Sequence, residues 1–310
     1  MSEVYFYKGF FDFSGNQTTI NRIASYFPNS IQTYNLDNIN RKTVIGIHAY
    51  KSGLFMLNKN FNYIIIIGGT DINQDINIPH KRSIIEMCLN NATFIIVFNN
   101  YMFTKIRTCF PKLPNVVIIP QAVPRILIDR IDLRKELNIY DKRKLYLMAA
   151  NLRPVKDPLF LAKIFEELWF RDRTTLIIVG KNSENYQFSN GMIHLGPKNI
   201  NIVHSMMQQV DGYINTSIEE GMSSSILEAM KIGCPVYARS NCGNLAIIQH
   251  LYSGFIFENP EEFLNLIKLP TDDIKKNALK YVNIRHTQKK EKESYTKLVN
   301  LMNKYKHVHI

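Results

Sequence analysis

The chain has few cysteines, four among its 310 residues. No two of them stand at the close spacing typical of zinc ligands, and only Cys234 and Cys242 are near each other in sequence. This scarcity argues against a disulfide-stapled scaffold and against a zinc site. It predicts reduced, partly buried thiols, as is usual for a cytoplasmic protein.

Long hydrophobic runs are also missing. The longest, "YIIIIGG" at 63–69, has the length of a buried strand and is too short to cross a membrane as a helix. The first ten residues, "MSEVYFYKGF", lack the basic segment and apolar core of a secretory signal. We therefore expect a cytoplasmic protein without a membrane-spanning segment.

Two further absences exclude classes of function. No Gly-x-Gly-x-x-Gly follows a strand-like segment, which argues against a nicotinamide-dependent dehydrogenase. The formal charge of +12 would attract phosphates, nucleic acid or an acidic membrane surface. Nucleic-acid binding would rest on that charge alone, because no motif of interleaved aromatic and basic residues is present. We expect no nucleic-acid partner.

Much of the positive charge stands in the tail "KKEKESYTKLVNLMNKYKHVHI" at 289–310, where charges of both signs are mixed. Such mixing is typical of a solvated helix face, which is the interpretation we prefer. A peripheral contact between this basic surface and a membrane remains an alternative.

Strand-like and helix-like segments alternate along the chain, which predicts an α/β fold. The strands of the first half are continuous in Ile and Val, as in a parallel sheet covered on both faces. They are expected at 4–8, 43–50, 63–69, 93–98 and 115–120, with a helix over 14–27.

A domain boundary is expected near 125–142, where a proline-rich stretch gives way to a charged one. The second half repeats the alternation, and its first helix should begin with Asp157 as N-cap and Pro158 in the first turn. The simplest architecture is two doubly wound, Rossmann-like domains that face each other across a cleft. We expect an N-terminal domain over 1–130, a second domain over 131–285, and a tail over 286–310 that could pack back on the first.

The segment "EEGMSSSILEAM" at 219–230 follows the strand-like "GYINTS" and begins a helix. The N–H groups of a first helical turn, together with the helix dipole, form an anion site. Here that turn would contain Ser223, Ser224 and Ser225. Two acids, Glu220 and Glu228, could hold hydroxyl groups beside it, so a sugar nucleotide would suit both features. The alternative is a plain serine-capped helix with acids near its start.

The pattern Glu220-x7-Glu228, within "TSIEEGMSSSILEAMKIGCPVYARSNCGNLAIIQH", resembles the signature of the retaining glycosyltransferases of family 4, which adopt the GT-B fold. The segment "NLRPVKDPLFLAKIFEEL" resembles their phosphate-binding Arg/Lys loop. The resemblance is strong over about 145–260, patchy over 43–125 and absent from the tail. It implies transfer of a hexose from a UDP- or GDP-linked sugar to an unknown acceptor hydroxyl, with no resident cofactor. The chain has no Asp-x-Asp motif, and we expect no metal.

The resemblance also implies roles for single residues. Arg153 and Lys156 would bind the donor diphosphate, although many members place more residues between the two, so Lys156 is the better match. Glu220 would orient the hexose and Glu228 would grip the ribose. His48, at the end of a strand, would assist near the reacting centre. Each has a plainer alternative, surface charge for the two cations and a packing role for the histidine.

Further substrate contacts are expected at turns. The turn "SGNQTT" at 14–19 corresponds to a glycine-rich loop of the family, although a capping turn would look the same. Asp71 could bind substrate or cap a helix. The loop with His194 would hold the nucleotide base. The remaining candidates are Gly15, Asn16, Gly243 and Asn244. Because the first half is short and the Arg/Lys spacing is compressed, the second hypothesis is a catalytically degenerate protein that binds nucleotide sugars without turning them over.

Overall fold

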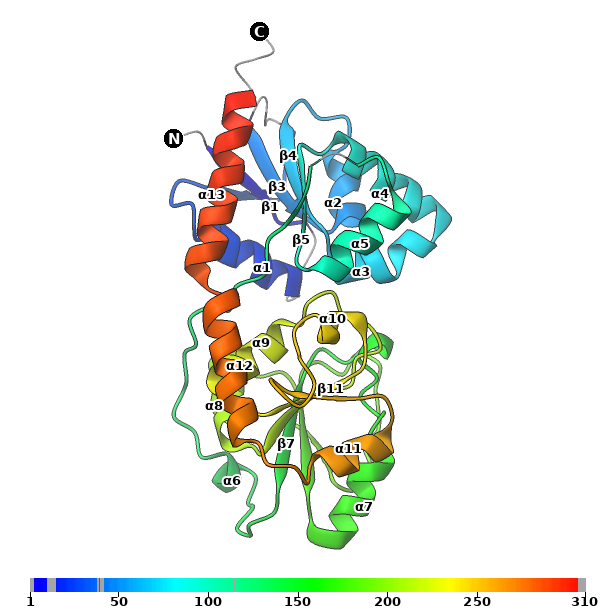
Figure 1. The fold of residues 1–310 in the computed structure, drawn as a ribbon, viewed down its shortest axis with the longest axis vertical. Coiled ribbons are helices and arrows are strands. Elements are labelled where there is room, and N and C mark those ends of the chain that lie inside the picture. Colours follow the sequence, from blue (N-terminus) through cyan, green and yellow to red (C-terminus); the bar gives the residue numbers. More distant parts are fainter. Residues whose placement is uncertain (1–2, 10–14, 38, 40–41, 114, 306–310) are drawn as a thin grey trace. The chain divides into compact units, whose positions relative to one another are not determined.

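The computed structural model describes residues 3–9, 15–37, 39, 42–113 and 115–305 (Figure 1). The chain forms two compact units. The first comprises residues 1–122 together with 287–310, and the second comprises residues 123–286. Ser14 of the expected glycine-rich turn lies outside the described residues.

The first unit contains a six-stranded sheet in the order β2-β1-β3-β4-β5-β6, with every neighbouring pair parallel. The Ile/Val-rich central strands are buried on both faces, which confirms the expected parallel sheet. The strands are β1 Val4–Tyr7, β2 Ile31–Thr33, β3 Thr43–Ile47, β4 Asn62–Ile66, β5 Phe94–Val97 and β6 Val116–Ile118.

The helices of this unit are α1 Gly15–Ala24, α2 Ala49–Met56, α3 Gly69–Asn73, α4 Pro79–Asn91, α5 Asn100–Cys109 and α13 Gln288–Tyr305, with a 3₁₀ turn η1 over Asp75–Asn77. Figure 1 shows α13, in red and orange, beside the dark blue α1. A buried bidentate ion pair joins them, because Arg22 Nε and Nη2 lie 2.9 and 3.1 Å from the two carboxylate oxygens of Glu291. The hydroxyl of Tyr26 donates to the same carboxylate at 2.6 Å.

The second unit also contains six parallel strands, in the order β12-β11-β10-β7-β8-β9. The doubly wound α/β prediction is therefore confirmed in both units. The strands are β7 Leu145–Ala149, β8 Thr175–Val179, β9 Met192–His194, β10 Gly212–Asn215, β11 Val236–Arg239 and β12 Phe255–Phe257.

Two hydrophobic cores cover the two faces of this sheet, since alternate residues of a strand point to opposite faces. Leu145 and Leu147 of β7 belong to the core that contains residues of α8, α9 and α12. Tyr146 and Met148 belong to the core that contains residues of α7 and α11. The helices are α6 Leu133–Glu136, α7 Ala162–Asp172, α8 Ile200–Gln209, α9 Ser224–Ile232, α10 Cys242–Leu245, α11 Pro260–Leu266 and α12 Asp272–Arg285, with a 3₁₀ turn η2 over Pro154–Lys156.

The predicted start of the helix that follows β7 is wrong. Helix α7 begins at Ala162 with Leu161 as N-cap, four residues after the expected Asp157. Asp157 instead ends the 3₁₀ turn in the left-handed conformation, at φ 42°, and not in the extended conformation typical of an aspartate N-cap. Its carboxylate lies 2.7 Å from Nη1 of Arg239, which explains why it does not cap the helix.

The four cysteines are free thiols. Cys88 and Cys234 are buried, Cys109 is half-buried and Cys242 is exposed. Burial raises the pKa of the Cys88 and Cys234 thiols to about 12, so both stay protonated at neutral pH. In the part of the chain that the structure describes, no helix is long and apolar enough to cross a membrane.

Candidate functional site

The candidate residues of the second unit gather at one edge of its sheet. Strands β7, β10 and β11 are parallel neighbours, so their carboxyl ends lie at the same edge. The turn after β7 carries Arg153 and Lys156, and the turn after β10 carries Glu220. Gly243 follows β11. This edge is where ligands bind in open α/β sheets.

An ion pair links two of these turns. Lys156 Nζ lies 2.5 Å from Oε1 of Glu220, with 18% and 12% of the side chains exposed. The same carboxylate oxygen accepts a hydrogen bond from the Ser217 hydroxyl at 2.8 Å and from the Asn215 amide at 3.3 Å. The Glu220 carboxylate is therefore held in one orientation by three side chains.

The environment favours an ionised Glu220. Burial opposes the charge, but the Lys156 ammonium and the hydrogen bonds from Ser217 and Asn215 outweigh it, so the pKa of Glu220 is lowered from its ordinary value of 4.5. A fixed negative charge beside a fixed positive charge can hold a hydroxyl-bearing group next to an anionic one.

The turn that carries Lys156 is fastened to the end of β10. Thr216 donates its hydroxyl to the Lys156 carbonyl at 2.8 Å, and the Ile218 N–H donates to the Val155 carbonyl at 2.9 Å. Arg239 holds the end of the turn through its 2.7 Å pair with Asp157. Arg153 is exposed and has no ion pair among the residues that the structure describes.

Gly243 lies directly against the Glu220 turn. A Cβ at position 243 would stand 2.3 Å from the Glu220 carbonyl oxygen, so only glycine fits. Asn244 is fully buried, and its amide group donates to Oδ1 of Asn215 at 3.2 Å and to the Arg239 carbonyl at 3.0 Å. Both residues therefore support the turn and the Asn215 side chain that bonds Glu220.

Helix α9 starts where the three serines were expected to start it. Ser223 is the N-cap residue, but its side chain makes no capping hydrogen bond to the helix. Its hydroxyl instead lies 3.1 Å from that of Ser225 and accepts from Asn215 at 3.4 Å. Ser224 is the first helical residue. The helix ends at Gly233, which adopts the left-handed conformation with φ 83°.

Glu228 lies one helical turn into α9 and is nearly buried. Its Oε2 is 3.5 Å from Nε2 of His204 on α8, with 8% and 3% of the side chains exposed. The other ring nitrogen of His204, Nδ1, lies 3.0 Å from the Leu127 carbonyl oxygen. The second acid of the motif thus also faces a side chain that can carry positive charge.

His194 stands at the end of β9, which strands β7 and β8 separate from β10. Its Nε2 donates to the Gly180 carbonyl at 2.8 Å, since a carbonyl can only accept. Its ring lies 5.5 Å from that of Phe188. Gly196, just beyond, adopts φ 68° with no atom within 4 Å of where a Cβ would stand.

In the first unit, His48 follows β3 and is almost fully buried. Its backbone has φ 73°, a strained value for a residue other than glycine, and such strain recurs at functional positions. Nδ1 lies 2.7 Å from Oδ1 of Asp71, and Nε2 lies 3.6 Å from Oδ2 of Asp75. The short Asp71 contact thus orients the ring, and the Asp75 carboxylate faces its other nitrogen from beyond hydrogen-bond distance.

Asp71 connects the start of α2 to the start of α3. Its oxygens accept from the backbone N–H groups of Ala49, Tyr50 and Gly68 at 2.7, 3.0 and 2.9 Å, besides facing His48. It therefore caps α2, as well as its own helix.

His48, Asp71 and Asp75 are close enough to share a cation. The carboxylate oxygens already have other partners, however. Those of Asp71 accept hydrogen bonds from three backbone N–H groups, and Asp75 forms an ion pair with Lys81 at 2.6 Å. A metal would have to displace these partners. The set fits the bracing of an imidazole better than the binding of a metal ion.

Gly15 and Asn16 form the start of α1. Gly15 is exposed, and a Cβ there would meet no atom within 4 Å. Asn16 is half-buried. These positions leave room for a ligand, and their roles stay predictions.

Three residues that sequence reasoning missed belong to the site, namely Asn215, Arg239 and His204. Asn215 and Arg239 end neighbouring parallel strands, so topology would have pointed to them once the strand order was known. His204 stands on the apolar face of a helix, where a lone histidine carries no signal in the sequence.

The chain resembles known sugar transferases. Residues 129–286 match the family model for glycosyl transferases group 1. Glycosyltransferase 1 domain-containing protein 1 from Xenopus tropicalis is 30% identical over 276 residues, which are 82% of this chain and 80% of that protein. The Escherichia coli UDP-Gal:alpha-D-GlcNAc-diphosphoundecaprenol alpha-1,3-galactosyltransferase is 27% identical over 178 residues, 52% of this chain and 45% of that enzyme.

Solved structures share the fold. A crystal structure of Anabaena HepE in complex with UDP-glucose superposes with a TM-score of 0.82 at 14% identity, over 97% of this chain and 100% of that one. Sucrose-phosphate synthase from Thermosynechococcus elongatus gives 0.78 at 11% identity, over 98% and 100%. The predicted GT-B fold is confirmed.

Proposed function

Because the chain belongs to the group 1 glycosyl transferases, we propose that it transfers a hexose from UDP-hexose to an acceptor hydroxyl with retention of configuration. The observation that carries the proposal is the Lys156–Glu220 pair beside the start of α9. The choice of UDP is supported by relatives, since the E. coli enzyme acts on UDP-Gal by its name and HepE was crystallised with UDP-glucose.

In this proposal the bond between the anomeric carbon and the diphosphate oxygen breaks, and the acceptor oxygen bonds to that carbon on the same face. The acceptor proton passes to the departing phosphate oxygen. Lys156, Arg153 and the first-turn N–H groups of α9 stabilise the negative charge that grows on the diphosphate. These groups supply positive charge at the leaving group, so we propose that no metal ion is needed.

Glu220 orients the hexose hydroxyls, and Glu228 accepts from the hydroxyls of the ribose. Both are carboxylates held by partners, so they lose little further freedom when the donor binds. Catalytic assistance by His48 remains a prediction from the resemblance. Its strained backbone and its carboxylate brace support that role.

The test is transfer or hydrolysis of UDP-glucose, UDP-galactose and UDP-GlcNAc by the purified protein across a panel of acceptors. The controls are Lys156→Ala and Glu220→Gln. Thermal shift with UDP, GDP and ADP identifies the nucleotide, because a ligand that binds only the native state raises its melting temperature. The proposal fails if no UDP-sugar binds.

A catalytically degenerate binding protein is the second candidate. It is favoured by Arg153, which is exposed and makes no ion pair within the described part of the chain that would hold it at a diphosphate. The same experiment separates the two, because binding of a UDP-sugar without turnover on any acceptor supports the binding protein.

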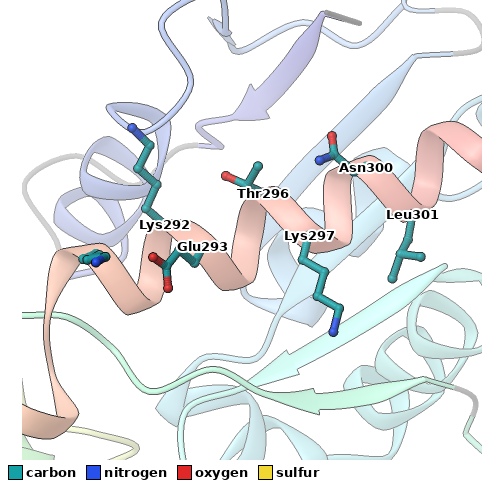
Figure 2. A pocket seen from close by; sticks show the side chains of 7 residues that line it. Lys292, Glu293, Thr296, Lys297, Asn300 and Leu301 are labelled. Atoms are coloured by element: carbon teal, nitrogen blue, oxygen red, sulfur yellow. The ribbon is translucent and has the colours of Figure 1, made fainter.

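We also propose that this protein is cytoplasmic and touches acidic membranes through α13. A hollow of about 710 Å³ runs along that helix, and Figure 2 shows Lys292 and Lys297 extending from it. Its lining residues are Lys289, Lys292, Glu293, Thr296, Lys297, Asn300 and Leu301. Each lysine near an anionic surface contributes about 1 kcal/mol. Sedimentation with phosphatidylserine vesicles should weaken in Lys292→Gln/Lys297→Gln and stay unchanged in the α12 control Lys276→Gln/Lys280→Gln.

A further inference from the structure

The ring of His204 is held between two acceptors in the second unit. Nδ1 lies 3.0 Å from the Leu127 carbonyl oxygen, and Nε2 lies 3.5 Å from Oε2 of Glu228. Only 3% of the histidine side chain and 8% of the glutamate side chain are exposed. Among the residues that the structure describes, Nε2 has no hydrogen-bond partner, and the Glu228 carboxylate at 3.5 Å is the acidic group that it faces.

The proton on the ring can be placed by elimination. A backbone carbonyl has no hydrogen to donate, so Nδ1 of His204 must carry the proton of that contact. A neutral imidazole would then turn the lone pair of Nε2 toward the Glu228 carboxylate, which also presents only lone pairs. Two acceptors at this distance repel each other, and water is largely excluded. A hydrogen between Nε2 and the carboxylate would make the contact attractive.

We propose that His204 is a positioning residue for Glu228, because the buried carboxylate faces its Nε2, and that it keeps this carboxylate where it meets the ribose of a bound UDP. The inference rests on the proposed function, in which Glu228 accepts from ribose hydroxyls. An ionised carboxylate has about four lone-pair sites. One is directed at His204, and others can accept the 2′- and 3′-hydroxyls.

The arrangement parallels that of the first acid. Glu220 is held by Lys156 from the turn after β7, and Glu228 is held by His204 from α8. Each carboxylate of the motif thus has its own basic partner from a different element. A histidine with a packing role only would not need a carboxylate facing its Nε2.

Two variants distinguish the contact of Nδ1 with Leu127 from the contact of Nε2 with Glu228. In His204→Asn, the amide can still donate to the Leu127 carbonyl, but nothing reaches Glu228. In His204→Gln, the longer side chain places an amide donor near the Nε2 position. The measurement is calorimetric binding of UDP and of 2′-deoxy-UDP. The ratio of their dissociation constants measures how much the ribose 2′-hydroxyl contributes to binding.

We expect the wild type to bind UDP roughly tenfold tighter than 2′-deoxy-UDP, about 1.4 kcal/mol. The ratio should fall to about twofold in His204→Asn and recover largely in His204→Gln, as expected when one hydrogen bond to a charged group is lost and regained. In a Glu228→Gln background, His204→Asn should change the ratio no further. Melting temperatures of the ligand-free variants show whether folding is affected.

An unchanged ratio in His204→Asn, or additive effects in the double variant, would overturn this inference while leaving the proposed function intact. A lower melting temperature with the ratio preserved would assign His204 a packing role instead. If the wild type binds neither UDP nor 2′-deoxy-UDP, the proposed function fails together with this inference.

Discussion

Lys156 and Glu220, 64 positions apart in the sequence, meet at 2.5 Å between Nζ and Oε1. The contact ties the turn after β7 to the turn after β10, two neighbouring strands of the second sheet. Each residue fixes the other, so a change at either one alters both the charge at the edge of the sheet and its geometry.

Replacing Lys156 by Ala should reduce kcat with a UDP-sugar by about 10²–10³, comparable to the loss of one preorganised donor to a developing anion. Lys156→Arg should retain part of the activity, because it keeps the positive charge although not the same geometry. Steady-state kinetics on both variants check this. Equal kcat in Lys156→Ala and wild type would show that the cation plays no part in the reaction.

Acid should weaken the folded state partly through Glu220. Its pKa is lower in the folded protein than its ordinary value of 4.5, so the unfolded state binds more protons in this range. Stability from this group is therefore present above about pH 4.5 and is lost as the pH falls through the folded value. Urea unfolding between pH 3 and 7 gives the free energy of unfolding at each pH. On the acid side this free energy should fall less steeply for Glu220→Gln than for the wild type, and the two slopes should differ by at most about 2.303RT, the value for one proton. Parallel slopes would contradict it.

Gly243→Ala should damage the site without unfolding the protein. The new methyl group would stand 2.3 Å from the Glu220 carbonyl, so the turn carrying Glu220 must move. A displacement of about 1 Å can reduce kcat/KM by roughly 10²-fold. Cys242→Ala, at the exposed neighbouring position, is the matched control. Circular dichroism should be unchanged in both, and the prediction is wrong if the two variants have the same kcat/KM.

Replacing Arg239 should affect donor binding indirectly, through the turn that carries Lys156, and less than the changes at Lys156 or Gly243. It pairs with Asp157 at 2.7 Å, and its guanidinium lies 3.8 Å from the centroid of the Phe160 ring. A partly exposed pair contributes at most about 1 kcal/mol. Arg239→Met should therefore raise the KM for the donor by up to about fivefold and leave kcat nearly unchanged. A collapse of kcat instead would mean that Arg239 touches the reacting groups.

Asp71→Asn should destabilise the first unit. The amide cannot accept as well as the carboxylate from three backbone N–H groups and face His48 too. Loss of a hydrogen bond to a buried charged group lowers the free energy of unfolding by about 1.5–3 kcal/mol. Denaturant titration measures the change, with Asp37→Asn on the exposed surface as the control. Equal stability of the two variants would contradict the bracing role.

Much of the fold could be predicted from the sequence because Ile/Val runs identify buried parallel strands without reference to the rest of the chain. The short strands β2 and β9 were missed because neither has the run of Ile and Val that identified the equally short β6. The start of α7 was misplaced because Asp157 and Pro158 look like a helix start locally. A partner 82 positions away, Arg239, takes the carboxylate instead.

The candidate site was predictable only in part. The motif around Glu220 identified both acids and the helix start, since those residues are adjacent along the chain. The partners of the acids were not visible, because Asn215, His204 and Arg239 reach the site through strand order and helix packing. Such contacts depend on the tertiary structure, and a pattern of neighbouring residues does not report them.

The most direct test of the account is calorimetric binding of UDP and of uridine to the wild type and to Lys156→Ala. A diphosphate held by Lys156 beside the start of α9 predicts that the variant binds UDP at least about tenfold more weakly, or about 1.4 kcal/mol. Uridine, which has no phosphate, should bind both proteins equally. Equal affinity of both proteins for UDP would contradict the central claim.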